Sequence, residues 1–291
     1  MTQATAYPAA LALGNALPAA SAVVMTHRAP RNGSTPTVLL VHGAFADGSM
    51  WAGVIAGLQA AGVGVIALAN PLRGLASDAA YIASAAAEID GPVILAGHCY
   101  GGAVITAAAA AVGNAVGLVF VTGFALDEGE SALDITGRFP GSQLVRSLRP
   151  AAFCGTNGDP DVELYIDREA FPHVFAADLP SCTAAAAAAA QRPITAAAFE
   201  EKQQAAAWKQ IPCWYVIATM DLLIPVEAQW FMAQRAGAHT LEVHASHAIA
   251  VTQPVAVAGH ITAAASAVRK ARPGQRGWPD NPDDPGRSPT K

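Results

Sequence analysis

Apolar residues in the first half of this chain gather into four short runs, separated by segments of helix-like composition. The runs are rich in Val, Ile and Leu: TVLLVHG (37–43), VGVIALA (63–69), PVILAG (92–97) and VGLVFVTG (116–123). The separating segments, residues 50–62, 77–89 and 102–113, are rich in alanine, a good helix former. Strands that are apolar on both sides and alternate with helices predict a parallel sheet with helices on both faces.

The same alternation returns near the C-terminal end. Strand-like runs occur at PCWYVIAT (212–219) and HTLEVHA (239–245), and helical patterns cover residues 227–237 and 254–270. We therefore predict one α/β core with a mostly parallel central sheet. This core is formed by residues 36–126 and 208–271.

Residues 127–207 interrupt the alternation. They contain no convincing strand pattern and include a run of seven alanines at 184–190. This composition predicts a mainly helical insertion. Such an insertion would cap one end of the sheet and shape a pocket there.

The two ends of the chain lack this patterning. Residues 7–24 are apolar and include a small-residue run at 20–22, as an export signal does, but no Lys or Arg precedes Arg28 and two prolines interrupt the run. We therefore predict an N-terminal extension over residues 1–35 and a cytoplasmic protein, with export as the alternative. Residues 272–291, which include five prolines and three glycines, predict a disordered tail.

Charge and hydropathy argue against two classes of partner, nucleic acid and the membrane interior. The net charge is −5, only 13% of the residues are charged, and no block of Lys and Arg lies within the predicted core. This balance disfavours nucleic acid as a partner. No uninterrupted apolar run reaches the length of a bilayer span, so we expect no membrane-spanning segment.

The four cysteines are Cys99, Cys154, Cys182 and Cys213. None belongs to a C-x-x-C pair, which disfavours zinc and thioredoxin-like sites. Cys213 lies in a predicted strand, and we assign it to the core. We expect free thiols at Cys154 and Cys182, with a disulfide between them as the alternative in an exported protein.

Candidate chemistry centres on Cys99, in the sequence GHCYGG (97–102) between a predicted strand and a predicted helix. A nucleophile on such a sharp turn needs glycines two positions before and after it, because side chains would collide there. The N-terminus of the following helix supplies partial positive charge, which favours a thiolate. Residues 97–102 therefore predict a nucleophile elbow with cysteine as the nucleophile.

Two backbone amides are candidates for an oxyanion hole. Acyl transfer needs N–H donors where the tetrahedral intermediate carries its charge. Ala44 follows the strand-ending sequence VHG (41–43), and Tyr100 follows the nucleophile. We predict that the amides of Ala44 and Tyr100 form this hole, and that His42 fixes the loop instead of taking part in catalysis.

The general base should be a histidine in a loop after a late strand. Of eight histidines, His244 and His247 frame the loop after the last predicted strand, and His247 lies further from the strand and directly before the final helix. We therefore choose His247 over His244. The spacing of the two would also suit a metal, but no acidic or cysteine ligand completes a site, and we predict none.

The acid that orients His247 is predicted to be Asp221. This residue directly follows the strand at 212–219, which gives the chain order nucleophile, acid, base. Asp127, after the strand at 116–123, is the alternative.

Four motifs together resemble those of an α/β-hydrolase: VHGAFADGSMW, LAGHCYGGAV, IPCWYVIAT with the following Asp221, and SHAIAVTQP. More narrowly, they resemble bacterial members related to plant methyl-ester hydrolases and hydroxynitrile lyases. The resemblance covers residues 36–270 and implies a cofactor-free nucleophile–His–acid hydrolase with a cap over the pocket.

The chain departs from this family at several positions. Cys99 occupies the usual serine position, and an aspartate nucleophile, as in dehalogenases and epoxide hydrolases, is excluded. The lyases have a lysine after the catalytic histidine and a threonine beside the oxyanion loop, where this chain has Ala248 and Gly43. A lyase is therefore disfavoured.

We predict hydrolysis of a small, mostly apolar carboxylic ester or lactone through a covalent acyl-enzyme, with Cys99 either native or in place of serine. The alternatives are an acyltransferase that uses the same acyl-enzyme and a non-catalytic binder of small ligands. Candidate pocket walls are Phe45, Phe124, Tyr165, Phe171, Phe175 and Ile224.

Overall fold

The structure is a computed structural model that describes residues 35–155 and 158–270. The predicted tail (272–291) lies outside these residues, and so does the N-terminal extension except for Thr35. The predictions about an export signal in the N-terminal extension and about disorder in the C-terminal tail therefore stay predictions.

Within the described residues, six parallel strands form the central sheet, in the order β2-β1-β3-β4-β8-β9. Their bounds are β1 Thr37–Val41, β2 Val65–Leu68, β3 Val93–His98, β4 Ala115–Val121, β8 Cys213–Ala218 and β9 His239–Val243. All neighbouring strands pair in parallel. The predicted strands and their α/β arrangement are confirmed.

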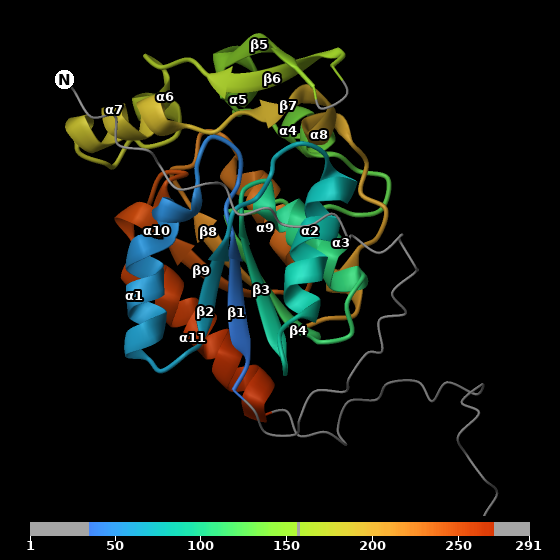
Figure 1. Cartoon of the computed structure of the whole chain (residues 1–291). Coiled ribbons are helices and arrows are strands. Elements are labelled where there is room, and N and C mark those ends of the chain that lie inside the picture. The colour runs from blue at the N-terminus through green and yellow to red at the C-terminus, as the bar shows by residue number, and fades with distance from the viewer. Residues whose placement is uncertain (1–34, 156–157, 271–291) are drawn as a thin grey trace, which may run out of the picture.

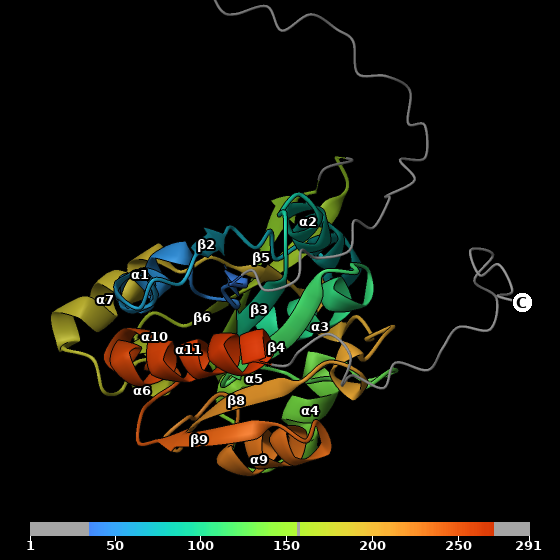
Figure 2. The same ribbon diagram turned by 90° about the horizontal axis from the view of Figure 1, so that it is seen from below.

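Side chains of alternate strand positions pack into two separate apolar layers. Leu39 and Val41 belong to one layer and Val38 and Leu40 to the other, because successive residues of a strand face opposite sides. Helices α2 (Leu75–Ala87), α3 (Gly101–Ala110) and α9 (Val226–Arg235) cover the first face. The other face packs against α1 (Ala52–Ala60), with its leading turn η1 (Gly48–Trp51), α10 (Ile249–Thr252) and α11 (Pro254–Lys270). The view from below in Figure 2 shows the helices on either side of the sheet.

The insertion between β4 and β8 lies beyond the carboxyl ends of the sheet strands (Figure 1). Its elements are α4 (Ala132–Arg138), α5 (Leu144–Ser147), β5 (Leu148–Cys154), β6 (Pro160–Ile166), α6 (Phe171–Val174), α7 (Ser181–Ala190), β7 (Ile194–Thr195), α8 (Ala196–Glu200) and η2 (Ala207–Lys209). The carboxyl ends of the central strands, where the candidate catalytic loops begin, therefore face this insertion.

The expectation of an insertion without strands is wrong. Strands β5, β6 and β7 form an antiparallel sheet, with β5 and β6 paired from Leu148–Ile166 to Cys154–Pro160. Pro150 and the acidic residues Asp161 and Glu163 hid the strands, because such residues are depleted in sheets. They are accommodated here because β5 is an edge strand and most of this hairpin is partly or fully exposed.

None of the helices in the two described segments is both long and apolar enough to cross a bilayer.

The turn from β3 into α3 depends on close backbone packing at its glycines. A Cβ on Gly97 would lie 2.4 Å from the carbonyl oxygen of Gly101, and one on Gly102 would lie 2.7 Å from the amide nitrogen of Phe124. Both contacts are with backbone atoms, which cannot rotate away. The glycines are therefore required by the packing between α3, β3 and the end of β4.

We predict that Gly97→Ala destabilises the protein by about 2 kcal/mol or more, because overpacking a tight core contact costs energy and forces the backbone to shift. The measurement is the midpoint of urea unfolding. Gly137→Ala is the matched control: its Cβ meets nothing within 4 Å and it lies in α4, so we expect a neutral or slightly stabilising effect. Equal midpoints for the two variants would contradict the packing argument.

Candidate active site

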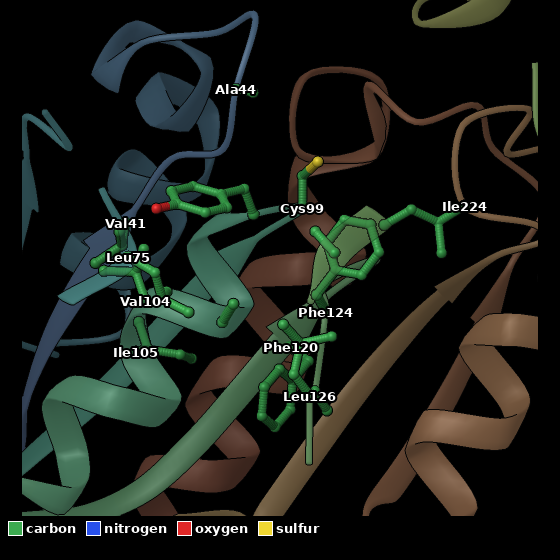
Figure 3. Packing of buried hydrophobic residues seen from close by; sticks show 14 of the residues in the cluster. Val41, Ala44, Leu75, Cys99, Val104, Ile105, Phe120, Phe124, Leu126 and Ile224 are labelled. Carbon is green, nitrogen blue, oxygen red and sulfur yellow. The ribbon is translucent and has the colours of Figure 1, made fainter. Parts of the chain in front are cut away.

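Cys99 lies at the apex of the turn between β3 and α3, with a positive φ of 51°. A non-glycine residue rarely adopts this conformation, and strained backbone of this kind is typical of functional sites. The residue is only 4% exposed. Figure 3 shows its side chain projecting from the start of α3, with Phe124 and Ile224 on one side and the loop of Ala44 on the other.

His247 lies in the loop between β9 and α10 and is fully buried. Its Nδ1 lies 2.7 Å from Oδ2 of Asp221, and since a carboxylate accepts, Nδ1 carries the proton. Burial lowers the pKa of this imidazole, but the Asp221 carboxylate and the Cys99 sulfur outweigh that effect and raise it to about 10. Its Nε2 is buried and has no hydrogen-bond partner among the described residues.

The Asp221 carboxylate is itself surrounded by donors. Its Oδ1 accepts the backbone N–H groups of Leu223 at 2.7 Å and of Ile224 at 3.0 Å. These bonds orient the carboxylate so that Oδ2 faces His247. The structure thus brings together Cys99, His247 and Asp221, the three side chains that the sequence singled out.

Two further side chains bind Asp221 and were missed at the sequence level. The hydroxyl of Thr122 donates to Oδ2, and Nε2 of Gln229 lies 3.3 Å from the same oxygen. Thr122 has a φ of 40°, which is an outlier for a β-branched residue. The signals that could have drawn attention to them are the position of Thr122 directly after β4 and the polar Gln229 among the buried positions of α9.

The rejected alternatives lie elsewhere. Asp127, the alternative acid, pairs with Lys209 at 2.5 Å on the surface. His244 is exposed, with Nδ1 3.3 Å from the hydroxyl of Thr219. Across residues 35–155 and 158–270, no group of three His, Cys, Asp or Glu side chains is arranged to hold a metal ion.

The loop after β1 is fixed so that its amides are available. His42 accepts the N–H of Asn70 at 3.0 Å through Nε2, while the Asn70 side chain donates to the His42 carbonyl. Phe45 has a φ of 64°. In the described part of the chain, no hydrogen bond joins the N–H of Ala44 or that of Tyr100 to another backbone group, which leaves both amides available as donors.

The Tyr100 ring points away from this chemistry. Its hydroxyl donates to Oδ2 of the buried Asp78 at 3.0 Å. Burial raises the pKa of Asp78 and of Tyr100. Only the backbone amide of Tyr100 is therefore a candidate for the site.

Most of the predicted pocket walls pack in the same apolar cluster as Cys99: Phe45, Phe124, Phe171, Phe175 and Ile224. The Phe175 ring lies 4.9 Å from the His247 ring in a T-shaped arrangement. Tyr165 is outside this cluster, so the prediction that it lines the pocket is wrong. It lies on β6, donates to Glu163 at 2.7 Å and lines a separate cleft of about 480 Å³. Its aromatic character suggested a pocket, but the charged positions around it place this part of β6 near solvent.

The remaining cysteines are separate from this site and carry free thiols. Cys154 and Cys182 are exposed, in the insertion. Cys213 is buried in β8, and burial raises the pKa of its thiol to about 12. Cys213 is therefore a core residue with little thiolate character.

Comparisons with known proteins bear on the family and the fold of the chain. The model of a family described as the alpha/beta hydrolase family matches residues 38–260. A search of curated proteins finds no match to the chain.

Solved structures provide the fold likeness. A pyrethroid hydrolase from Sphingobium faniae JZ-2 is 22% identical, with a TM-score of 0.65 over 80% of this chain and 98% of that one. Polyneuridine aldehyde esterase is 18% identical, with a TM-score of 0.67 over 79% and 99%. A methylesterase from Arabidopsis is 17% identical, with a TM-score of 0.65 over 79% and 99%. At these identities the likeness shows the fold.

We predict that Thr122→Val destabilises the protein by about 1–3 kcal/mol, because it removes a donor from a buried carboxylate. Valine is also β-branched, so the backbone strain at position 122 is unchanged. The measurements are urea unfolding and the low-field NMR signal of the His247 Nδ1 proton, which we expect to shift.

Thr106→Val is the control for this change. Thr106 is also fully buried, but its hydroxyl donates to the carbonyl of Gly102 within α3. We expect its variant to leave the His247 signal in place. An unmoved signal in Thr122→Val would mean that the hydroxyl does not act on Asp221.

Proposed function

The chain belongs to the alpha/beta hydrolase family, and from that membership we propose that it hydrolyses small, uncharged carboxylic esters or lactones through a triad of Cys99, His247 and Asp221. The observation that carries the proposal is the 2.7 Å hydrogen bond between Nδ1 of His247 and Asp221, in a buried site that also contains Cys99. This hydrogen bond fixes the tautomer and leaves Nε2 free to exchange a proton with the sulfur.

In the first step, His247 takes the thiol proton of Cys99 and the thiolate attacks the ester carbonyl carbon. The raised pKa of His247 supports this step, since an imidazolium beside a thiolate is stabilised by Asp221. The new C–S bond pushes the carbonyl π electrons onto oxygen. The amides of Ala44 and Tyr100 are the donors proposed for that charge.

Collapse of the intermediate breaks the ester C–O bond, and the imidazolium of His247 gives its proton to the leaving alkoxide. The product is a thioester on Cys99 and a free alcohol. Water then attacks the thioester carbonyl while His247 removes a proton from it. The second tetrahedral intermediate expels the thiolate and releases the acid.

The substrate class follows from the surroundings of the sulfur. Phe124 and Ile224 lie beside Cys99 (Figure 3), Phe45 belongs to the same apolar cluster, and all three are nearly fully buried. A charged group placed among them would lose its hydration without gaining a partner. We therefore propose a substrate whose acyl part is apolar and uncharged.

We predict that Cys99→Ser lowers kcat/KM on short p-nitrophenyl esters by roughly tenfold or more, because an alcohol is far less readily ionised than a thiol. Cys99→Ala should abolish turnover. Intact mass spectrometry should show the acyl group on the parent chain and none on Cys99→Ala.

Cys182→Ser is the control, because this exposed thiol lies outside the site. It should leave turnover unchanged. A serine variant faster than the parent would show that the site is built for oxygen, and an acyl adduct at any other residue would overturn the assignment of the nucleophile.

The raised pKa of His247 also predicts a pH dependence. A group with a raised pKa keeps its proton until the pH approaches that value, so the imidazolium beside Cys99 should persist from pH 6 to 9. The ring of His98, centred 4.6 Å from that of His247, stays neutral above pH 6.5, because burial lowers its pKa well below the ordinary value. The proposal that Cys99 is the thiolate partner of this imidazolium then predicts that alkylation of Cys99 by iodoacetamide changes less than about twofold over this range.

A free thiol provides the contrast, since its alkylation should rise about a hundredfold or more between pH 6 and 9 as thiolate forms. The experiment uses a Cys154→Ser/Cys182→Ser chain, which removes the exposed thiols, and locates the label by peptide mapping. If Cys99 follows the profile of the free thiol, the thiolate–imidazolium pair does not form.

A further inference from the structure

The residue before His247 is anchored to the insertion by a carboxylate. The N–H of Ser246 donates to Oδ2 of Asp178 at 3.0 Å, and the Ser246 hydroxyl donates to Oδ1. Ser246 is 1% exposed, whereas Asp178 is half-buried, in the segment after α6. Both oxygens of Asp178 are thus directed at one residue, 68 positions away in the chain.

The residue after His247 is anchored to the same segment. The N–H of Ala248 donates to the carbonyl of Phe175 at 2.9 Å, and the Ser246 oxygen lies 3.2 Å from that carbonyl. Segment 175–178 therefore holds the chain on both sides of His247. The hydroxyl of Ser246 also accepts the Ala248 N–H at 3.1 Å, which links the two anchors.

The core contributes a third anchor to the backbone of His247. Nε2 of His98 lies 2.9 Å from the His247 carbonyl and must donate, because a carbonyl only accepts. His98 directly precedes Cys99, so this bond links the base to the nucleophile turn. Only the anchors from Asp178 and Phe175 come from the insertion.

We propose that Asp178 is a positioning residue, which holds the His247 loop so that the imidazole faces both Asp221 and Cys99. This inference rests on the proposed function for its catalytic meaning. A hydrogen bond to a carboxylate is stronger than one to a neutral group, and Asp178 makes two of them to the residue next to the base. Removal of both lets the loop sample positions in which the imidazole has left Asp221.

The test compares Asp178→Ala and Asp178→Asn in the Cys154→Ser/Cys182→Ser chain. We expect kcat of Asp178→Ala to fall roughly tenfold or more with KM within about twofold, because two charge-assisted hydrogen bonds are lost but no residue of the apolar cluster is changed. Asparagine keeps one oxygen as an acceptor, so Asp178→Asn should recover part of the loss. It also serves as the readout if the alanine variant does not fold.

Two readouts are independent of ester turnover. The low-field Nδ1 proton signal of His247 should broaden or disappear in Asp178→Ala. The ratio of Cys99 alkylation rates at pH 9 and pH 6 should rise roughly tenfold toward that of a free thiol, because the thiolate loses its imidazolium partner. The ratio is used because easier entry of the reagent would raise both rates equally.

Asp134→Ala is the matched control. Asp134 is also an insertion carboxylate that accepts a backbone N–H, that of Ser131 at 2.8 Å, and pairs with Lys202, but it lies on the exposed side of α4. The Asp134→Ala variant should leave the Nδ1 signal of His247 and the alkylation ratio of Cys99 unchanged.

The outcomes separate the two proposals. If Asp178→Ala keeps the parent's Nδ1 signal and alkylation ratio, or changes them no more than Asp134→Ala does, the positioning role is wrong. If the parent chain turns over no ester while Asp178→Ala loses the Nδ1 signal, the proposed function fails and the positioning role stands.

Discussion

The site depends on the burial of one negative charge. A carboxylate removed from water is costly unless donors surround it, and Asp221 is 6% exposed. Its donors come from separate parts of the chain: Leu223 and Ile224 in its own loop, Thr122 after β4, Gln229 on α9 and His247 after β9. Because each donor must reach the same two oxygens, the carboxylate fixes the ends of these elements relative to one another.

The central fold could be predicted from the sequence because a sheet covered on both faces leaves continuous apolar runs. Such runs marked β1, β3, β4 and β8, which are almost entirely buried. The strands of the insertion could not be predicted in this way. In β6 apolar side chains alternate with the acidic residues Asp161 and Glu163, and most of the strand is not buried. Its hydrogen bonds to β5 and β7 define it as a strand, and these are not visible in the sequence.

The site was predictable where a residue's position follows from chain order. Cys99, Asp221 and His247 each come after a strand of a parallel sheet, so their loops meet at one edge. Thr122 and Asp178 are different, because their roles depend on partners 99 and 68 positions away. No local pattern encodes such a pairing. The sequence shows a threonine directly after the β4 strand, but it does not show the strain that marks this residue as unusual, which is known only from its φ.

The insertion contacts three loops of the candidate site, those that contain Phe45, Asp221 and His247, through backbone hydrogen bonds. The N–H of Phe45 donates to Arg192 at 2.8 Å and that of Ala248 to Phe175 at 2.9 Å, while the N–H of Gln143 donates to Leu222 at 2.7 Å. Bonds between backbone groups do not depend on which side chains the insertion carries. Side chains that face the apolar cluster can therefore change without release of these three loops. Two side-chain anchors are exceptions: Asp178 accepts two hydrogen bonds from Ser246, and the hydroxyl of Ser142 donates to the Leu223 carbonyl at 2.8 Å. Substrate preference can thus vary across most of the insertion, whereas the position of His247 constrains residue 178.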